Sequence, residues 1–180
     1  MSVLPAETPV SMPIGRPRTT RSRRSGRLPG LPPAPGVTFA ALGVDRALVA
    51  VLAKDGITTP RPIQAAAVPD ALAGLDILGR AQTGSGKTLG FSLPLVARLA
   101  GGHTMACRPR GLVLVPTREL ATQVQTVLSP LASAMGLTVT AIFGGTPQGP
   151  QVAALRNRAD IVVACPGRLA DLIGQGHCHL

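Results

Sequence analysis

The chain has few cysteines, few acidic residues and no long apolar run. Three cysteines in 180 residues are too few for the disulfide framework on which small secreted domains depend, so they favour a reducing compartment. No apolar run approaches the roughly 20 residues that cross a bilayer. The paired arginines Arg23 and Arg24 are not followed by the apolar segment of an export signal. The sequence therefore argues against a disulfide-stapled, exported or membrane-spanning protein, and we expect a cytoplasmic one.

The shortage of acidic residues gives the chain a strong positive charge. Eight Asp and Glu stand against 18 Lys and Arg, a net charge of +10. Residues 1–36 hold six arginines, one glutamate and eight prolines, which predicts a flexible basic arm able to contact nucleic acid without sequence preference. A solvated extension without function is the alternative for this arm. Residues 37–180 are also basic, and the hydrophobic content of 45% over the whole chain predicts that most of it forms a folded domain.

Residues 81–88 read Ala-Gln-Thr-Gly-Ser-Gly-Lys-Thr and have the pattern of a phosphate-binding loop. They follow a short apolar run at residues 76–80, where we expect a strand, and precede a helical pattern at residues 89–99. Two glycines allow the backbone N–H groups to surround phosphate oxygens, and the helix start adds the positive end of its dipole. We expect Lys87 to reach the β- and γ-phosphates and the Thr88 hydroxyl to help hold Mg²⁺. The first position of the generic pattern is glycine, and here it is Ala81.

The remainder of the domain alternates helical patterns with short apolar runs, which predicts a parallel α/β sheet with crossover helices on both faces. We expect strands at residues 111–115, 138–143 and 161–164, and helices at residues 45–55, 62–72, 118–135, 148–156 and 168–173. Ligands of such sheets bind outside the carboxyl ends of the strands. The segments at Gln82, Pro116, Gly144 and Cys165 occupy these positions.

Five segments, in order and spacing, resemble the motifs of the DEAD-box RNA helicases. Residues 56–64, Gly-Ile-Thr-Thr-Pro-Arg-Pro-Ile-Gln, are similar to the Q motif, and Phe39 lies seventeen residues before them, where the family has an isolated aromatic. The loop at residues 81–88 is similar to the family's phosphate loop, in which alanine in the first position is ordinary. Residues 116–121 resemble motif Ia, residues 144–145 the glycine doublet, and residues 165–168 the Thr-Pro-Gly-Arg motif.

This resemblance implies a RecA-like ATP-binding domain over residues 37–180 and assigns roles to individual residues. Phe39 would pack on the adenine of ATP, and the Gln64 amide would read the adenine edge. The phosphates would be held by Gln82, Thr83, Gly84, Ser85, Gly86, Lys87 and Thr88, with Thr88 also directed at Mg²⁺. RNA phosphates would be bound by Pro116, Thr117, Arg118, Gly145, Gly167 and Arg168, contacts that position a strand without reading its sequence.

Two features depart from the family. Cys165 stands where the family has a threonine placed to cap a helix, so we expect Cys165→Thr to stabilise the fold or tighten RNA binding. No Asp-Glu pair occurs in the chain, so the hydrolytic carboxylates of the Asp-Glu-Ala-Asp motif are missing, as is the second RecA-like domain. We therefore expect a domain truncated before that strand, with no catalytic residue of its own and negligible ATPase activity.

The resemblance leaves two alternatives to a part of an ATP-dependent RNA helicase. The first is a truncated product that binds nucleotide or RNA without catalysis, and the second is a different phosphate-loop enzyme such as a kinase or a DNA helicase. Salt-sensitive RNA binding without ATP hydrolysis would favour the first alternative. The Q motif together with motif Ia argues against the second.

Overall fold

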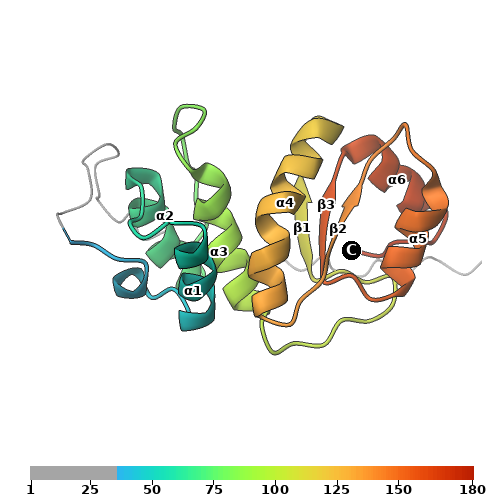
Figure 1. Ribbon diagram of the computed structural model, residues 1–180. Coiled ribbons are helices and arrows are strands. Elements are labelled where there is room, and N and C mark those ends of the chain that lie inside the picture. The colour runs from blue at the N-terminus through green and yellow to red at the C-terminus, as the bar shows by residue number, and fades with distance from the viewer. Residues whose placement is uncertain (1–35) are drawn as a thin grey trace, which may run out of the picture.

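Three parallel strands form the centre of the fold (Figure 1). The computed structural model describes residues 36–180, so that the predicted basic arm lies, except for Gly36, outside the described residues. The strands are β1 (Gly111–Leu114), β2 (Val139–Ile142) and β3 (Ile161–Ala164), in the order β1-β3-β2. Six α-helices surround them in the described residues: α1 (Arg46–Lys54), α2 (Pro62–Leu72), α3 (Lys87–Leu99), α4 (Arg118–Ala134), α5 (Gln148–Arg156) and α6 (Pro166–Gly174), preceded by the short 3₁₀ helix η1 (Ala40–Leu42).

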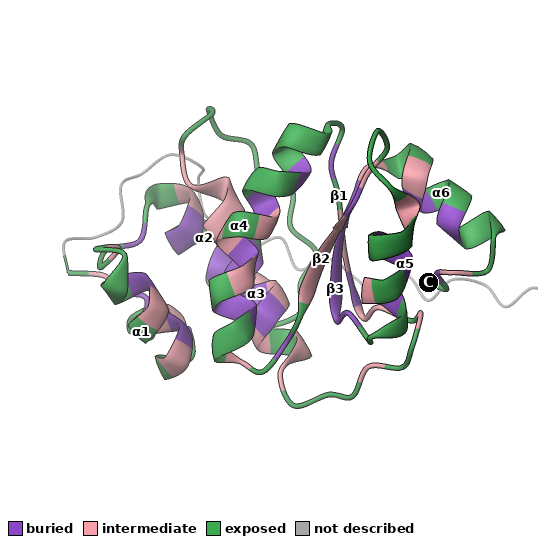
Figure 2. Cartoon of the chain, turned by 45° about the vertical axis from the view of Figure 1, so that its right-hand side comes forward, coloured by how far each residue is buried: buried purple, intermediate pink, exposed green. Residues whose placement is uncertain are grey.

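The central strand β3 is buried on both faces, and its alternate side chains divide between two cores. Ile161 and Val163 pack in a core shared with α1–α4, whereas Val162 and Ala164 pack against α5, α6 and the segment that follows α6. Figure 2 shows the buried surfaces of the helices turned toward this strand from either side. The predicted parallel sheet with helices on both faces is confirmed. Within residues 36–180 no helix is both long enough and apolar enough to cross a membrane.

Most predicted elements occur within one or two residues of their expected bounds. The helix at Pro62–Leu72 begins at the proline because a ring-fixed φ and a missing N–H suit the first helical position. The strand at Ile161–Ala164 also matches, since a continuous run of β-branched residues suits a strand buried on both faces. Local sequence signals were therefore sufficient for these elements.

The strand predicted at residues 76–80 is wrong. The segment has no regular secondary structure, and β1 and β2 each pair with β3 alone. A strand exists only where a neighbour accepts and donates its backbone hydrogen bonds, and the described residues supply none beside this segment. Its apolar side chains are therefore left uncovered: Leu78 is 86% exposed.

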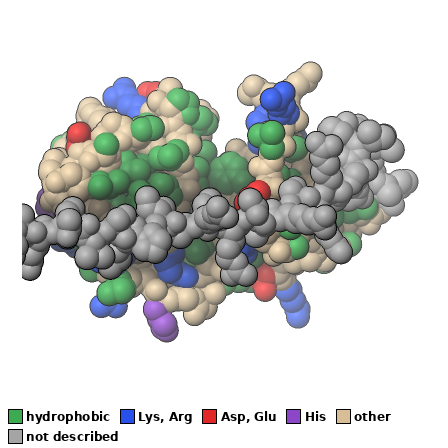
Figure 3. Space-filling view, turned by 180° about the vertical axis from the view of Figure 1, so that it is seen from behind, with side chains coloured by type: hydrophobic (Ala, Val, Ile, Leu, Met, Phe, Trp, Pro, Cys, Tyr) green, Lys and Arg blue, Asp and Glu red, His purple; other side chains and the backbone are tan. Residues whose placement is uncertain are grey.

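An apolar cavity of about 630 Å³ adjoins this uncovered segment. It is lined by Ile77 together with side chains of α2 and α3, including the partly exposed Phe91. Figure 3 shows hydrophobic side chains gathered near the middle of the rear face of the molecule. Residues 76–80 and this cavity therefore leave apolar side chains uncovered in the described structure.

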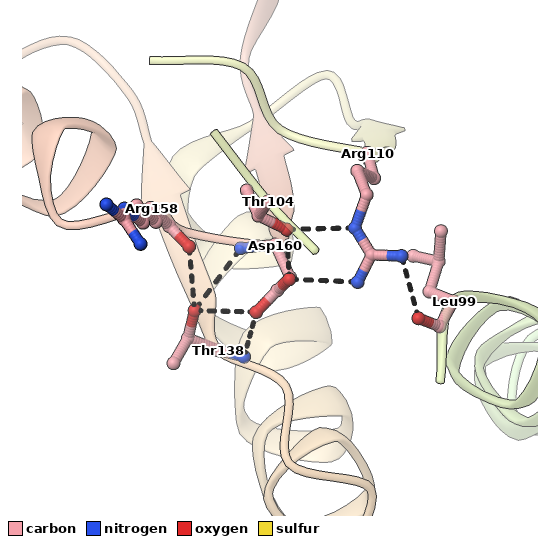
Figure 4. A network of polar contacts seen from close by, with 6 residues as sticks. All are labelled: Leu99, Thr104, Arg110, Thr138, Arg158 and Asp160. Carbon is pink, nitrogen blue, oxygen red and sulfur yellow. Dashed lines mark hydrogen bonds and ion pairs between the residues drawn. The ribbon is translucent and has the colours of Figure 1, made fainter. Parts of the chain in front are cut away.

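A network around Asp160 ties together the segments that lead into the three strands (Figure 4). Its carboxylate pairs with Arg110 at 3.0 Å and accepts hydrogen bonds from the Thr104 hydroxyl and from the Thr138 backbone N–H at 2.9 Å. Arg110 also donates to the Leu99 carbonyl at 2.8 Å. Partial burial by itself raises the pKa of Asp160, but the hydrogen bonds from Thr104, Thr138 and Arg110 outweigh it and hold that pKa below its ordinary value.

Candidate functional site

A cavity of about 820 Å³ lies between the start of α2, the loop before α3, and α4. Its walls come from three stretches of sequence: Gly56, Ile57, Thr58, Thr59, Arg61 and Gln64; Thr83, Gly84, Gly86, Lys87, Thr88 and Leu89; and Leu120 and Gln123. The structure thus brings the Q-motif segment and the predicted phosphate loop to one cavity. No lining residue carries a carboxylate, so the cavity favours an anionic ligand.

The loop has the backbone geometry of an anion-binding turn. Gly84 and Gly86 have φ of 80° and 89°, in the left-handed region that suits glycine. Gly86 is the N-cap of α3, and among the described residues no hydrogen bond joins the N–H groups of Gly86, Lys87 or Thr88 to the chain. Unpaired N–H groups at the start of a helix bind phosphate oxygens. A Cβ at Gly86 would lie 2.4 Å from Nε2 of Gln64, so only glycine fits there.

Lys87 is folded back onto its own loop. Its Nζ donates to the carbonyl oxygens of Ala81 at 2.6 Å and Gln82 at 2.7 Å. These carbonyls hold the ammonium group in place of a ligand, so that binding a phosphate requires Lys87 to exchange them for phosphate oxygens. The Ser85 hydroxyl of the same loop is buried without a hydrogen-bond partner among the described residues, and Ser85 does not line the cavity.

Gln64 is already engaged within the chain. The side chain is 1% exposed; Oε1 accepts from the Arg61 N–H at 2.8 Å, and Nε2 donates to the Gly86 carbonyl at 3.0 Å. The amide keeps one further N–H and one oxygen lone pair, and Gln64 lines the cavity. Gln64 therefore connects the Q-motif segment, where the adenine is predicted to bind, to the glycine loop, where the phosphates are predicted to bind.

Phe39 does not face the cavity, contrary to the expectation that it packs on an adenine. It is 1% exposed and belongs to the core formed by η1, α1, α3 and α4. Burial of a large aromatic ring removes more apolar surface from water than exposure at a cavity rim would. Spacing from the Q motif identified the position but could not give the direction of the ring.

The residues predicted to bind RNA phosphates meet at the carboxyl ends of the strands. Pro116, Thr117 and Arg118 follow β1, Gly145 follows β2, and Gly167 and Arg168 follow β3. A Cβ at Gly145 would lie 3.5 Å from Nη1 of Arg118, and Arg168 donates to the Thr146 carbonyl at 3.2 Å. None of the six is buried. The predicted residues therefore form one accessible edge with two cationic side chains.

Helix starts shape this edge. The Thr117 hydroxyl caps α4 by accepting from the Leu120 N–H at 3.2 Å. Arg118 pairs with Glu119 at 2.8 Å and lowers the pKa of that exposed carboxyl, a surface pair that screening makes weak. Cys165 is the N-cap of α6 and makes no side-chain capping bond, as its departure from threonine predicts.

Sequence reasoning missed Arg61, which lines the cavity and donates through Nη1 to the Gly84 carbonyl. Leu120 and Gln123 of α4 were also missed as wall residues. The available signal for Arg61 was its position three residues before Gln64, which puts both side chains on one turn of a helix start.

A glycine-rich loop that opens α3 beside a cavity, next to a parallel sheet with helices on both faces, defines the class: a phosphate-loop domain of RecA-like α/β fold. The model of the DEAD/DEAH box helicase family matches residues 61–179, and the chain belongs to this family.

Individual relatives agree with the family. The chain is 43% identical over 155 residues to "DEAD-box ATP-dependent RNA helicase 52A" of Oryza sativa subsp. japonica, covering 79% of this chain and 25% of the relative. It is 50% identical over 126 residues to "ATP-dependent RNA helicase DBP3" of Phaeosphaeria nodorum, covering 69% of this chain and 21% of that protein. The chain therefore spans about a quarter of these relatives' length.

Solved structures show the same fold. The RNA helicase Prp28 of Chaetomium thermophilum, bound to ADP, is 40% identical with a TM-score of 0.74 over 79% of this chain and 35% of that one. A DEAD box protein from Methanococcus jannaschii is 33% identical with a TM-score of 0.72, covering 79% of this chain and 38% of that one.

Proposed function

We propose that this chain binds ATP and RNA as part of an ATP-dependent RNA helicase. The observation that carries the proposal is that the N–H groups of Gly86, Lys87 and Thr88, at the start of α3, are unpaired. These residues line the same cavity as Gln64. The relatives it matches are named ATP-dependent RNA helicases, which supports this reading. The nucleotide would lie with its base toward residues 56–64 and its phosphates toward residues 83–88.

The residues fit a phosphate chain. The glycine turn admits phosphate oxygens to the backbone N–H groups. Lys87 would move from the Ala81 and Gln82 carbonyls onto phosphate oxygens, exchanging neutral acceptors for charged ones that bind an ammonium more strongly. This exchange gives a reason for phosphate binding to be favourable although the lysine is already hydrogen-bonded.

Thr88 would hold Mg²⁺ through its hydroxyl, beside phosphate oxygens. Mg²⁺ would neutralise charge that develops during phosphoryl transfer. Among residues 36–180 no group of three His, Cys, Asp or Glu side chains could hold a metal, and no carboxylate lines the cavity. We therefore propose that the 180-residue chain binds the nucleotide but hydrolyses it negligibly, because no group orients the attacking water.

RNA would lie along the edge formed by Arg118, Gly145 and Arg168. Their exposure and the excess of basic residues in the domain favour contact with a phosphate backbone. In the complete enzyme a second RecA-like domain would close over nucleotide and RNA together. The absence of carboxylates from the cavity also supports the alternative, a non-catalytic nucleotide- or RNA-binding product.

Equilibrium binding of ATP and GTP to the 180-residue chain tests the proposal. Lys87→Ala should weaken ATP binding by at least about tenfold, because charge-assisted bonds to phosphate are lost. Lys54→Ala, an exposed lysine at the end of α1, is the matched control and should bind as the unchanged chain does. Gln64→Ala should reduce the preference for ATP over GTP. Absence of ATP binding to the unchanged chain would refute the proposed function.

A further inference from the structure

The side chain of Arg61 crosses from the start of α2 to the phosphate loop. Its Nη1 donates to the Gly84 carbonyl, and its Cδ would lie 3.0 Å from a Cβ placed on Gly86. The aliphatic stem therefore packs on one glycine while the guanidinium group holds the other. None of the roles assigned above to the phosphate loop or to Gln64 accounts for this contact.

Gln64 makes the companion contact from the same turn of α2. Its Nε2 donates to the Gly86 carbonyl at 3.0 Å, and its Oε1 accepts from the Arg61 backbone N–H at 2.8 Å. The carbonyls on both sides of Ser85 are thus fixed to the start of one helix. Arg61 and Gln64 are themselves joined, so the two contacts form one clamp.

This clamp determines where the loop's N–H groups point. In a trans peptide the C=O of one residue and the N–H of the next point in opposite directions, and the described chain has no cis peptide bond. Holding the Gly84 carbonyl fixes the Ser85 N–H, which closes the loop by donating to the Gln82 carbonyl at 3.3 Å, and holding the Gly86 carbonyl fixes the Lys87 N–H. The Lys87 N–H is one of the unpaired donors at the start of α3, the group that a phosphate would meet.

We propose that Arg61 is a positioning residue of the phosphate site, which pre-orders the loop by holding the Gly84 carbonyl before the ligand arrives. The proposal rests on the proposed nucleotide binding and adds a residue to it. Ordering the loop in advance lowers the entropy that a ligand must remove on binding. Arg61 then acts on the loop that receives the phosphates, so that ADP and ATP should depend on it alike.

Amide hydrogen exchange of the nucleotide-free 180-residue chain tests the clamp without any ligand. Arg61→Gln, which shortens the stem and removes the charge, should speed exchange of the Ser85 N–H, which donates to the Gln82 carbonyl at 3.3 Å, by about three- to tenfold, the effect of losing one solvent-exposed hydrogen bond. The matched control is Arg98→Gln, whose arginine donates to the Ala71 carbonyl at 3.4 Å outside the nucleotide cavity. Arg61→Lys keeps a charged donor, so its exchange rate should lie between those of the unchanged chain and Arg61→Gln. Equal exchange in Arg61→Gln and Arg98→Gln would overturn the proposal.

Measured affinities for ADP and ATP distinguish two roles of Arg61: ordering the loop, and attracting the nucleotide directly through its charge. Arg61→Gln should weaken both nucleotides about three- to tenfold, and the loss should persist at about 0.5 M salt, where long-range attraction is screened within a few ångströms. A loss confined to ATP that disappears at high salt, or a gain in affinity, would overturn the proposal. If the unchanged chain bound neither nucleotide, the proposed function would fail, while hydrogen exchange would still decide the role of Arg61.

Discussion

Nη2 of Arg110 lies 3.0 Å from Oδ1 of Asp160, and this pair joins the residues immediately before β1 and β3. Both side chains are largely shielded from solvent, with side-chain exposures of 22% for Arg110 and 11% for Asp160. The pair lies at the amino ends of the strands, whereas the predicted RNA-binding residues follow their carboxyl ends, and neither Arg110 nor Asp160 lines the nucleotide cavity. Its contribution is therefore to stability, and it can be altered without touching the candidate site.

We expect Asp160→Asn to lower the free energy of unfolding by about 1.5–3 kcal/mol at neutral pH, the range for hydrogen bonds that involve a charged group. Because the folded-state pKa of Asp160 is depressed, its stabilisation is fully present above the ordinary pKa of about 4 and is lost as pH falls through the folded value. The difference in free energy of unfolding between the unchanged chain and Asp160→Asn should therefore become smaller at acid pH. Denaturant unfolding across pH 3–7 measures it.

Asp171→Asn provides the matched control. Asp171 is exposed on α6, and the substitution likewise replaces one carboxylate oxygen by an amide nitrogen. It should change stability by less than about 0.5 kcal/mol. If the loss of unfolding free energy caused by Asp160→Asn stayed constant down to pH 3, the role assigned to the ionised carboxylate would be contradicted.

Gly86→Ala should weaken ATP binding at least about tenfold and lower the melting temperature. The new methyl group would meet Nε2 of Gln64, and the backbone there has φ of 89°, where a side chain costs about 1–2 kcal/mol. Gly149→Ala on α5 is the matched control, because nothing lies within 4 Å of its Cβ position. Thermal melting and nucleotide titration of both variants measure the effect. Normal ATP binding by Gly86→Ala would contradict the geometry of the loop.

The sequence was informative wherever a local signal decides the outcome. Proline at the first position of α2 and the continuous β-branched run of β3 set their own bounds, and the glycine pattern located the phosphate loop. Residues 76–80 failed as a strand because pairing depends on a neighbour elsewhere in the fold. Phe39 failed as a cavity residue and Arg61 was missed because the direction of a long side chain depends on what surrounds it. The motif residues could be proposed from the sequence, but their contacts required the structure.

Cys165→Thr should raise the free energy of unfolding by about 0.5–2 kcal/mol, the usual value of an N-cap. Cys165 already has the extended backbone of a cap, with φ of −84° and ψ of 133°, and lacks only the side-chain bond. Cys165→Val is the matched control, because valine has the shape of threonine without its hydroxyl. Melting temperature and RNA affinity are the measurements. If Cys165→Thr and Cys165→Val had the same melting temperature and the same RNA affinity, the capping interpretation would be wrong.

Leu78→Lys should reduce self-association of the chain and its binding of a hydrophobic dye, with little change in melting temperature. Leu78 is 86% exposed beside the apolar cavity that Ile77 and Phe91 help to line, and contiguous exposed apolar surface drives association between molecules. A side chain so exposed contributes little to stability, so the fold should tolerate the change within about 0.5 kcal/mol. Leu180→Lys introduces the same charge at another leucine, which is 70% exposed at the end of the chain, and should leave association unchanged. Sedimentation velocity compares the three proteins; equal association of Leu78→Lys and the unchanged chain would show that this surface is not the one through which molecules meet.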